Sequence, residues 1–191
     1  MNDEMKRWET IDGVKFLKRI GIKSGQTVLD FGARFGHYSL PTAKIVGKDG
    51  RVYALDKNSD ALDELKLKLA NQGLDNIILV KSDGNLKIEL ENKSVDVVLL
   101  YDVLHLIDNR KKLYFEVHRV LQNSGFLSVY PKHNKFDMPR WGLKNMTPKD
   151  IKNEIEAFGF SFEEEYCSSL SHDGSINQGC VLNFKKKGGI I

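Results

Sequence analysis

Apolar residues follow two different spacings along the chain, and each spacing predicts a different element. Short continuous apolar runs predict buried strands, whereas apolar residues three or four positions apart predict one face of a helix. The runs lie at 27–31, 51–56, 77–80, 95–101 and 125–130. Helical spacing occurs at 11–20, 39–46, 62–69, 113–121 and 151–158. This alternation predicts an α/β domain with a parallel sheet and right-handed crossovers.

Residues at the segment ends predict where the helices begin and end. Gly21 and Gly73 are expected to terminate the first and third helices, because glycine accepts the left-handed conformation that follows a helix. Ser39 is expected to cap the second helix, and Thr147-Pro148 to open the last one. The buried face of the first helix is expected to consist of four apolar residues, Ile11, Val14, Leu17 and Ile20.

The last two apolar segments, Phe160–Tyr166 and Cys180–Phe184, have no helical pattern between them. They are expected to pair as an antiparallel hairpin. The predicted fold is therefore a Rossmann-like, doubly wound, seven-stranded sheet, mostly parallel, with an antiparallel strand in a C-terminal hairpin. The basic run Lys185–Lys187 is expected to lie in a solvated tail at 185–191.

Composition restricts the classes of protein that fit this pattern. The 191 residues are 41% hydrophobic and 29% charged, which is typical of one globular domain over 1–191 with a core at about 10–187. The net charge of +3 is too small to favour a nucleic-acid or membrane partner. No apolar run reaches the roughly 18 residues of a membrane span, and no leader peptide is expected. We expect a cytoplasmic protein in which Cys167 and Cys180 are simply packed.

Candidate binding residues follow the predicted strands, because ligands of open α/β sheets bind beyond the carboxyl ends of the strands. Gly32 and Gly36 follow the first strand, at a spacing that differs from the dinucleotide fingerprint G-x-G-x-x-G. Asp56 ends the second strand, 24 positions beyond Gly32, where a carboxylate can accept hydrogen bonds from both hydroxyls of a ribose. A strand-end acid without a ligand is the alternative.

Further polar residues follow the third and fourth strands. Asp83 and Gly84 form either an ordinary turn or, through the carboxylate, a site for the amino group of an adenine. Tyr101, Asp102 and His105 follow the fourth strand and are candidates for contacts with a substrate. Taken by itself, His105 is more simply a packing or surface histidine.

Taken in order, these segments resemble the motifs of class I S-adenosylmethionine-dependent methyltransferases, of the small-molecule type 11/25 kind. The resemblance covers about 10–187 and rests on five segments: Val28–Gly36, Val52–Asp56, Ser82–Gly84, Ser94–His105 and Arg119–Leu127. It implies S-adenosylmethionine as cofactor and S-adenosylhomocysteine as product. The cofactor-binding residues that it implies are Asp30, Gly32, Arg34, Gly36, Asp56, Lys57, Asp83, Gly84 and Tyr101.

The resemblance also implies a mechanism that needs little acid–base chemistry, because the sulfonium already activates the methyl group. Alignment of nucleophile, methyl and sulfur would lower the barrier by about 7–11 kcal/mol. The catalytic candidates are His105, Asp102 and Tyr101, with His105 as the base if the nucleophile must lose a proton. His37 and His133 are weaker candidates, and no metal is expected, because Asp102 alone does not form a ligand set.

Arg34 departs from the family pattern, which has a glycine at this position. The arginine could face solvent, pair with an anionic group of cofactor or substrate, or obstruct the pocket; retained cofactor binding is the interpretation we favour.

The nature of the acceptor follows from what the fourth strand lacks. It is not followed by the N/D-P-P-Y/F sequence of enzymes that methylate nucleic-acid amino groups. We therefore expect a small-molecule acceptor, no nucleic-acid or membrane partner, and a monomer or homodimer. The loop at 132–146, with Trp141, is either part of a substrate lid or a surface loop with one anchoring tryptophan. The alternatives are a non-catalytic binding or regulatory protein of the same fold and, less favoured, a nicotinamide-dependent oxidoreductase.

Overall fold

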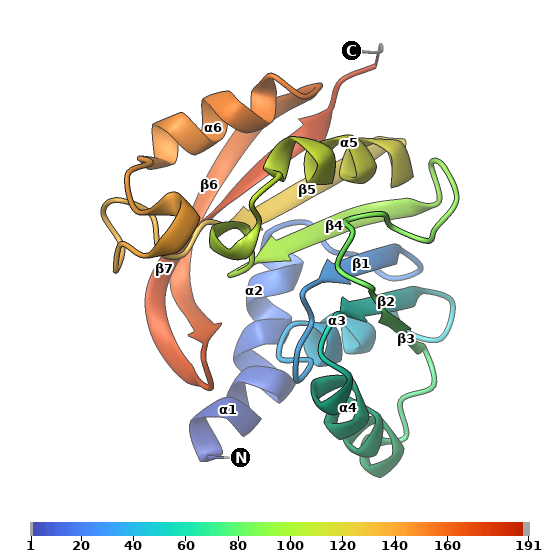
Figure 1. The fold of residues 1–191 in the computed structure, drawn as a ribbon. Coiled ribbons are helices and arrows are strands. Elements are labelled where there is room, and N and C mark those ends of the chain that lie inside the picture. Colours follow the sequence, from blue (N-terminus) through green and yellow to red (C-terminus); the bar gives the residue numbers. More distant parts are fainter. Residues whose placement is uncertain (1, 189–191) are drawn as a thin grey trace. The chain divides into compact units, whose positions relative to one another are not determined.

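The computed structural model describes residues 2–188, and its seven strands form one mixed sheet (Figure 1). The strands are hydrogen-bonded in the order β3-β2-β1-β4-β5-β7-β6. Strands β1, β2 and β3 pair in parallel, as do β4 and β5, whereas β7 is antiparallel to β5. The predicted fold class is confirmed. The strands are β1 (Thr27–Phe31), β2 (Arg51–Asp56), β3 (Ile77–Lys81), β4 (Val95–Tyr101), β5 (Leu121–Tyr130), β6 (Phe160–His172) and β7 (Ser175–Lys186).

The α-helices are α1 (Asp3–Arg7), α2 (Gly13–Arg19), α3 (Ser39–Val46), α4 (Ser59–Gln72), α5 (Arg110–Val120) and α6 (Pro148–Glu156). The short helices are the π-helix η1 (Trp8–Asp12) and the 3-10 helices η2 (Leu104–Leu106) and η3 (Trp141–Leu143). Local sequence fixes several of the helix ends. Thr147 and Asp150 form a capping box at α6, and Gly73 ends α4 at φ +62°.

The chain folds as two compact units, each with its own set of buried side chains. The first unit contains the residues up to Gly84 together with Ser168–Gln178, and the second contains Asn85–Cys167 and the residues from Gly179 onward. In the second unit, the Arg110 guanidinium donates two hydrogen bonds to Glu154, at 2.7 and 2.9 Å. Tyr114 also donates to Glu154, at 3.0 Å, so this carboxylate joins α5 to α6.

Two expectations about the first unit are wrong. Ile11 is 46% exposed, because the π-helix η1 shifts the helical phase and buries Trp8 and Glu9 instead. Ser39 does not cap α3: Tyr38 is the N-cap residue without a side-chain hydrogen bond, and the Ser39 hydroxyl donates to Asp30.

The C-terminal hairpin is longer than the apolar pattern predicts. Its two strands are joined by Asp173 and Gly174, both at positive φ, which suits the type I′ turn that follows the right-handed twist of the strands. Strand β7 continues to Lys186, so Lys185 and Lys186 belong to the strand rather than to a tail. Lys185 pairs with Glu163 at 2.7 Å. Residues 189–191 of the expected tail lie outside the described residues.

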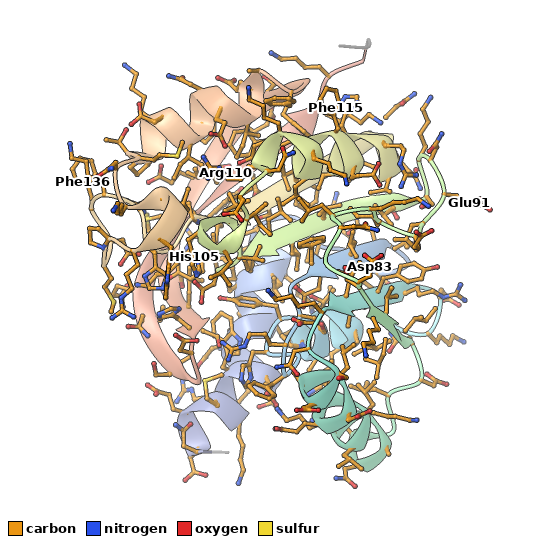
Figure 2. All side chains as sticks on the ribbon, viewed as in Figure 1. Asp83, Glu91, His105, Arg110, Phe115 and Phe136 are labelled. Carbon is orange, nitrogen blue, oxygen red and sulfur yellow. A yellow bond between two sulfur atoms is a disulfide. The ribbon has the colours of Figure 1, made fainter. Side chains whose placement is uncertain are left out.

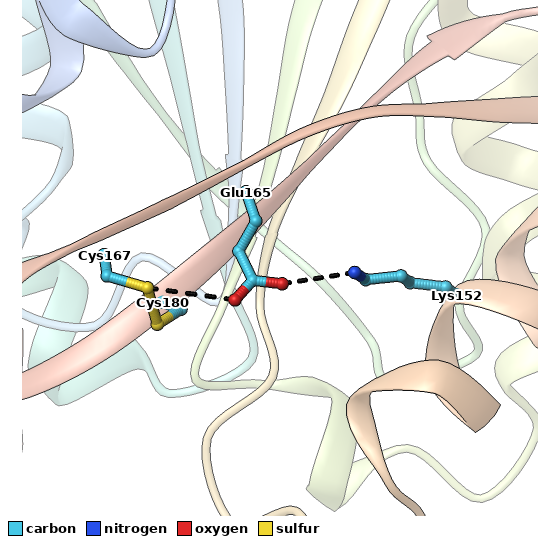
Figure 3. The surroundings of a disulfide bond; sticks show 4 residues. All are labelled: Lys152, Glu165, Cys167 and Cys180. Atoms are coloured by element: carbon cyan, nitrogen blue, oxygen red, sulfur yellow. Dashed lines mark hydrogen bonds and ion pairs between the residues drawn. A yellow bond between two sulfur atoms is a disulfide. The ribbon is translucent and has the colours of Figure 1, made fainter.

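Cys167 and Cys180 form a disulfide between β6 and β7, which corrects the expectation that they are only packed (Figure 3). Their Cα atoms are 4.0 Å apart. The Glu165 carboxylate lies 3.8 Å from the sulfur of Cys167, and its other oxygen pairs with Lys152 at 3.1 Å.

Among the described residues, no helix is both long and apolar enough to cross a membrane.

Candidate functional site

The loop between β1 and α3 owes its shape to its two glycines. Gly32 and Gly36 have φ angles of +85° and +79°, which residues with a Cβ rarely adopt. The amides of Gly32 and Ala33 both donate to the carbonyl of Leu55 on β2, at 2.8 and 3.0 Å. A Cβ on Gly36 would clash with the Leu65 side chain of α4. The loop is therefore held tightly against β2 and α4.

Asp56 at the end of β2 is 6% exposed, and both of its carboxylate oxygens are already oriented. Oδ2 accepts a hydrogen bond from the Arg34 amide and Oδ1 accepts one from the Asn58 amide, both at 2.8 Å. A carboxylate offers about four acceptor sites, so two hydrogen bonds leave capacity for two hydroxyl donors. The loop geometry thus presents a fixed carboxylate, and its role toward a ribose stays a prediction.

Asp30 is a buried carboxyl group near the end of β1, just before the same loop, with 3% exposure. Ser39 Oγ donates to its Oδ2 at 2.6 Å. Burial raises the pKa of Asp30 to about 7, the nearby negative charge of Asp56 adds to the increase, and the Ser39 hydrogen bond partly opposes it. Sequence reasoning missed this partner, because Ser39 was expected to cap α3.

Arg34, the residue that departs from the family pattern, adopts a positive φ of +44°. Its side chain is 57% exposed, and Nη1 pairs with Asp173 Oδ1 at 2.7 Å. Asp173 lies in the hairpin turn, and the Tyr38 hydroxyl donates to the Ser171 carbonyl of the same hairpin at 2.9 Å. In this structure the guanidinium therefore fastens the hairpin tip to the loop, while only the backbone of Arg34 touches Asp56.

We expect Arg34→Gly to change S-adenosylmethionine affinity by no more than about fivefold, because an exposed ion pair contributes only about 0–1 kcal/mol. The amide that donates to Asp56 is retained, and glycine accepts the positive φ. Isothermal titration calorimetry measures the effect. The matched control is Asp173→Asn, which breaks the same ion pair from the other side. A loss above tenfold in Arg34→Gly alone would mean that the guanidinium binds the cofactor itself.

Glu9 is a buried acid of the first unit that the sequence analysis missed. It lies in the π-helix η1 with 1% exposure, and its Oε1 is 2.8 Å from His37 Nδ1 and 3.8 Å from Lys68 Nζ. His37 belongs to the β1–α3 loop, so this contact fixes the far end of that loop. The segment Trp8–Asp12 looks like an ordinary polar helix turn in the sequence, and only the π-helix buries its acid.

The remaining candidates of the first unit lie at the surface. Lys57 and Asp83 are exposed, and Figure 2 labels Asp83 beyond the end of β3. Gly84 has φ +85°, and its amide donates to Ser82 Oγ at 3.1 Å. This is the ordinary turn that the sequence allowed, and the roles of these residues toward a cofactor stay predictions.

Three further candidates belong to the second unit. The Tyr101 side chain is 4% exposed, and its hydroxyl is hydrogen-bonded to Ser128 Oγ at 2.7 Å. Asp102 has φ +54°, and His105 lies in η2 with 6% exposure. The Asp102 carboxylate lies 3.7 Å from His105 Nδ1 and 3.9 Å from Nε2 of His133. The structure thus places His105, the favoured candidate base, and His133, a weaker candidate, beside the same carboxylate of Asp102.

The loop proposed as a lid packs on this group. The Trp141 ring stacks on His105, with centroids 4.9 Å apart, and meets His133 edge-on at 5.1 Å. His133 is only 1% exposed, whereas Trp141 is 54% exposed. Trp141 therefore contacts both histidines while about half of its surface stays exposed, and its role as a lid stays a prediction.

With this geometry established, comparison with known families identifies the chain. Residues 22–174 match the family model described as "Methyltransferase domain", so the chain belongs to that family. The class predicted from the sequence, a class I S-adenosylmethionine-dependent methyltransferase, is confirmed. The cofactor of this class is S-adenosylmethionine.

Individual relatives agree with this assignment. A demethylmenaquinone methyltransferase of Lactobacillus johnsonii is 29% identical over 115 residues, which is 60% of this chain and 47% of that protein. One from Staphylococcus aureus is 25% identical over 85% of this chain and 73% of its own length. The crystal structure of a SAM-dependent methyltransferase from Aquifex aeolicus superposes with a TM-score of 0.76 at 25% identity, covering 94% of this chain and 92% of that one. The match thus spans about half the length of the L. johnsonii protein.

Proposed function

We propose that the protein transfers a methyl group from S-adenosylmethionine to a small-molecule acceptor. The observation that carries this proposal is the buried Asp56 carboxylate, held by the amides of Arg34 and Asn58 at the glycine-shaped loop. Gly32 and Gly36 would give the cofactor close access to the loop backbone, and Asp56 would bind its ribose. Asp30 would support the loop through Ser39, with Lys57, Asp83 and Gly84 on the adenine side.

The chemical demand on the protein is modest. The bound cofactor supplies a methyl group on a positively charged sulfur, and the chain's task is to orient the acceptor and keep water away. Tyr101, Asp102 and His105 are the residues we assign to the acceptor side. The Tyr101 hydroxyl, engaged with Ser128, would shape the site rather than exchange protons.

A small acceptor is supported by the relatives, which are named for demethylmenaquinone, and by a net charge of only +3. The absence of nucleic-acid partners, the monomeric or dimeric state and the cytoplasmic location stay predictions. The Cys167–Cys180 disulfide is the observation that weighs against a cytoplasmic location, since disulfides persist mainly in oxidising compartments.

The decisive experiment is a calorimetric titration of dialysed protein with S-adenosylmethionine and then with S-adenosylhomocysteine. We expect micromolar binding of one molecule of each per chain, because the loop and Asp56 are already in position. ATP serves as the control ligand, since it shares the adenosine but lacks the methionine. Failure to bind either cofactor form would contradict the proposal and favour a non-catalytic protein of this fold. Binding would justify a screen of phenolic, amine and thiol acceptors by release of S-adenosylhomocysteine.

A further inference from the structure

Three potential metal ligands converge in the second unit, where the parallel strands β4 and β5 end. Asp102 directly follows β4, His105 lies in η2, and His133 follows β5. Each offers one ligand atom, and the three atoms lie within 4.8 Å of one another. Two of the separations, 3.7 and 3.9 Å, join Asp102 Oδ1 to a ring nitrogen of His105 and of His133.

One of the histidines is held by a backbone carbonyl at one ring nitrogen and faces Asp102 with the other. His133 Nδ1 lies 2.9 Å from the carbonyl oxygen of Met138. A carbonyl can only accept a hydrogen bond, so Nδ1 is the donor in this contact. Nε2 is the nitrogen that lies 3.9 Å from Asp102 Oδ1. Metal-binding histidines commonly donate their second ring N–H to a carbonyl or carboxylate in this way.

The rings are also fixed in orientation before any ligand binds. His105 and His133 meet edge to face, with centroids 4.6 Å apart and an interplanar angle of 75°. Trp141 contacts both rings, and the two histidines are 6% and 1% exposed. Figure 2 labels His105 at its place on η2. Such packing limits the freedom that ligand side chains would lose on binding an ion.

The backbone around this group is unusually constrained. Among the described residues, four non-glycine residues at positive φ belong to the group or to its supports: Asp102, His133, Met138 and Trp141. This conformation is costly for bulky residues such as methionine and tryptophan, and it persists where the surrounding structure holds it in place. The strain here orients the acid, one histidine, the carbonyl bonded to that histidine, and the covering ring.

From this geometry we propose that Asp102, His105 and His133 bind one divalent transition-metal ion. Two imidazoles and one carboxylate suit Zn²⁺ or Fe²⁺, whereas Mg²⁺ and Ca²⁺ prefer oxygen ligands. Ligands of a tetrahedral ion with bonds of about 2.0–2.1 Å lie about 3.3 Å apart, so the two separations from Asp102 need to contract by only about half an ångström. No metal was expected from the sequence, because Asp102 alone does not form a ligand set. His133 is 28 positions from His105, and only the fold brings the two histidines together.

Three protein ligands leave at least one coordination position open. That position would accept an oxygen or sulfur of the acceptor and lower its pKa, so that it reacts as an anion at neutral pH. This second part rests on the proposed function. It would replace the role of His105 as a base, since a metal-bound imidazole nitrogen cannot take up a proton.

The test uses the whole protein, treated with EDTA, dialysed, and titrated with Co²⁺ and Zn²⁺. We expect one ion per chain, with a visible absorption band for Co²⁺ that reports nitrogen and oxygen coordination, and an increase in melting temperature on binding. Mg²⁺ should produce neither effect. If the wild-type protein binds neither transition metal, the proposal is overturned.

Matched variants assign the ligands. His133→Asn and Asp102→Asn are chosen because asparagine tolerates the left-handed backbone of both positions. We expect each to weaken Co²⁺ binding at least about 100-fold, since loss of even an outer partner of a metal site costs about 10–100-fold. His118→Gln, a histidine of α5 outside this group, should bind Co²⁺ like the wild type. Equal affinity in all three variants, with circular dichroism confirming folded protein, would overturn the assignment.

The metal site and the proposed function can fail independently. S-adenosylmethionine titrations in EDTA measure cofactor binding without the ion, and Co²⁺ titrations measure the ion without the cofactor. Metal binding without cofactor binding would contradict only the proposed function. Cofactor binding without metal binding would contradict only this inference.

Discussion

Replacing Asp56 with alanine should weaken S-adenosylmethionine binding by at least about 100-fold. Hydrogen bonds to a charged group contribute about 1.5–3 kcal/mol each, and two ribose hydroxyls would lose their acceptor. At about 1.4 kcal/mol per tenfold change, the loss reaches two orders of magnitude or more. Calorimetry with S-adenosylmethionine and S-adenosylhomocysteine checks the value, and both ligands should be affected alike.

The controls separate loss of the ligand contact from loss of the loop. Asp56 also accepts the amides of Arg34 and Asn58, so the alanine variant loosens the backbone as well. Asp56→Asn retains one acceptor oxygen without the charge and should lie between wild type and alanine. Asp63→Ala removes an exposed carboxylate of α4 and should bind like wild type. A folded Asp56→Ala protein with unchanged affinity would exclude Asp56 as the ribose ligand.

The second large effect concerns Asp30 and the pH dependence of stability. The carboxyl pKa is raised from 3.8 to about 7 in the folded protein, mainly by burial. Between these values the folded chain binds more protons than the unfolded chain, so the free energy of unfolding falls as pH rises. The group's contribution is fully present below about pH 4 and lost above about pH 7. The difference corresponds to about 4 kcal/mol at most.

Asp30→Asn cannot ionise and should escape this loss, while its amide oxygen still accepts from Ser39. We expect the stability of the variant relative to wild type to grow steadily from pH 4 to pH 7 and then level off. Urea unfolding followed by circular dichroism at several pH values measures this difference. Asp63→Asn, at an exposed position, provides the control and should show no such trend. A difference that does not vary with pH would mean that Asp30 ionises normally.

Much of the fold could be predicted because local sequence and tertiary packing agree. The run Val95–Tyr101 is buried along nearly its whole length and forms β4 with the predicted bounds. Thr147 and Gly73 form the caps that their chemistry favours. The hairpin was predicted, but its full length was not, because polar residues fill β6 beyond Tyr166. The Asp173-Gly174 pair was a readable turn signal.

The candidate site was predictable only in part, and the reason is distance along the chain. Asp30, Asp56 and the two loop glycines stand beside predicted strand ends, where sequence motifs can be read. The partners that hold the β1–α3 loop come from distant parts of the chain. Asp173 pairs with Arg34 across 139 positions, and Glu9 contacts His37 across 28. The π-helix that buries Glu9 has no signature in a single sequence. His133 joins Asp102 and His105 only because β4 and β5 are neighbours.

The disulfide joins the two strands of the hairpin covalently on both sides of its turn. Cys167 and Cys180 lie 13 positions apart and enclose the turn that carries Asp173 and the carbonyl of Ser171. A protease that cuts the chain once between the two cysteines therefore releases no fragment, because β7 remains bonded to β6 through sulfur. The nicked protein would stay one molecule, heavier by the single water added on hydrolysis, until a reductant separates its C-terminal strand. Co-migration with the intact protein on a non-reducing gel thus does not establish an intact chain, whereas a reducing gel separates the two pieces.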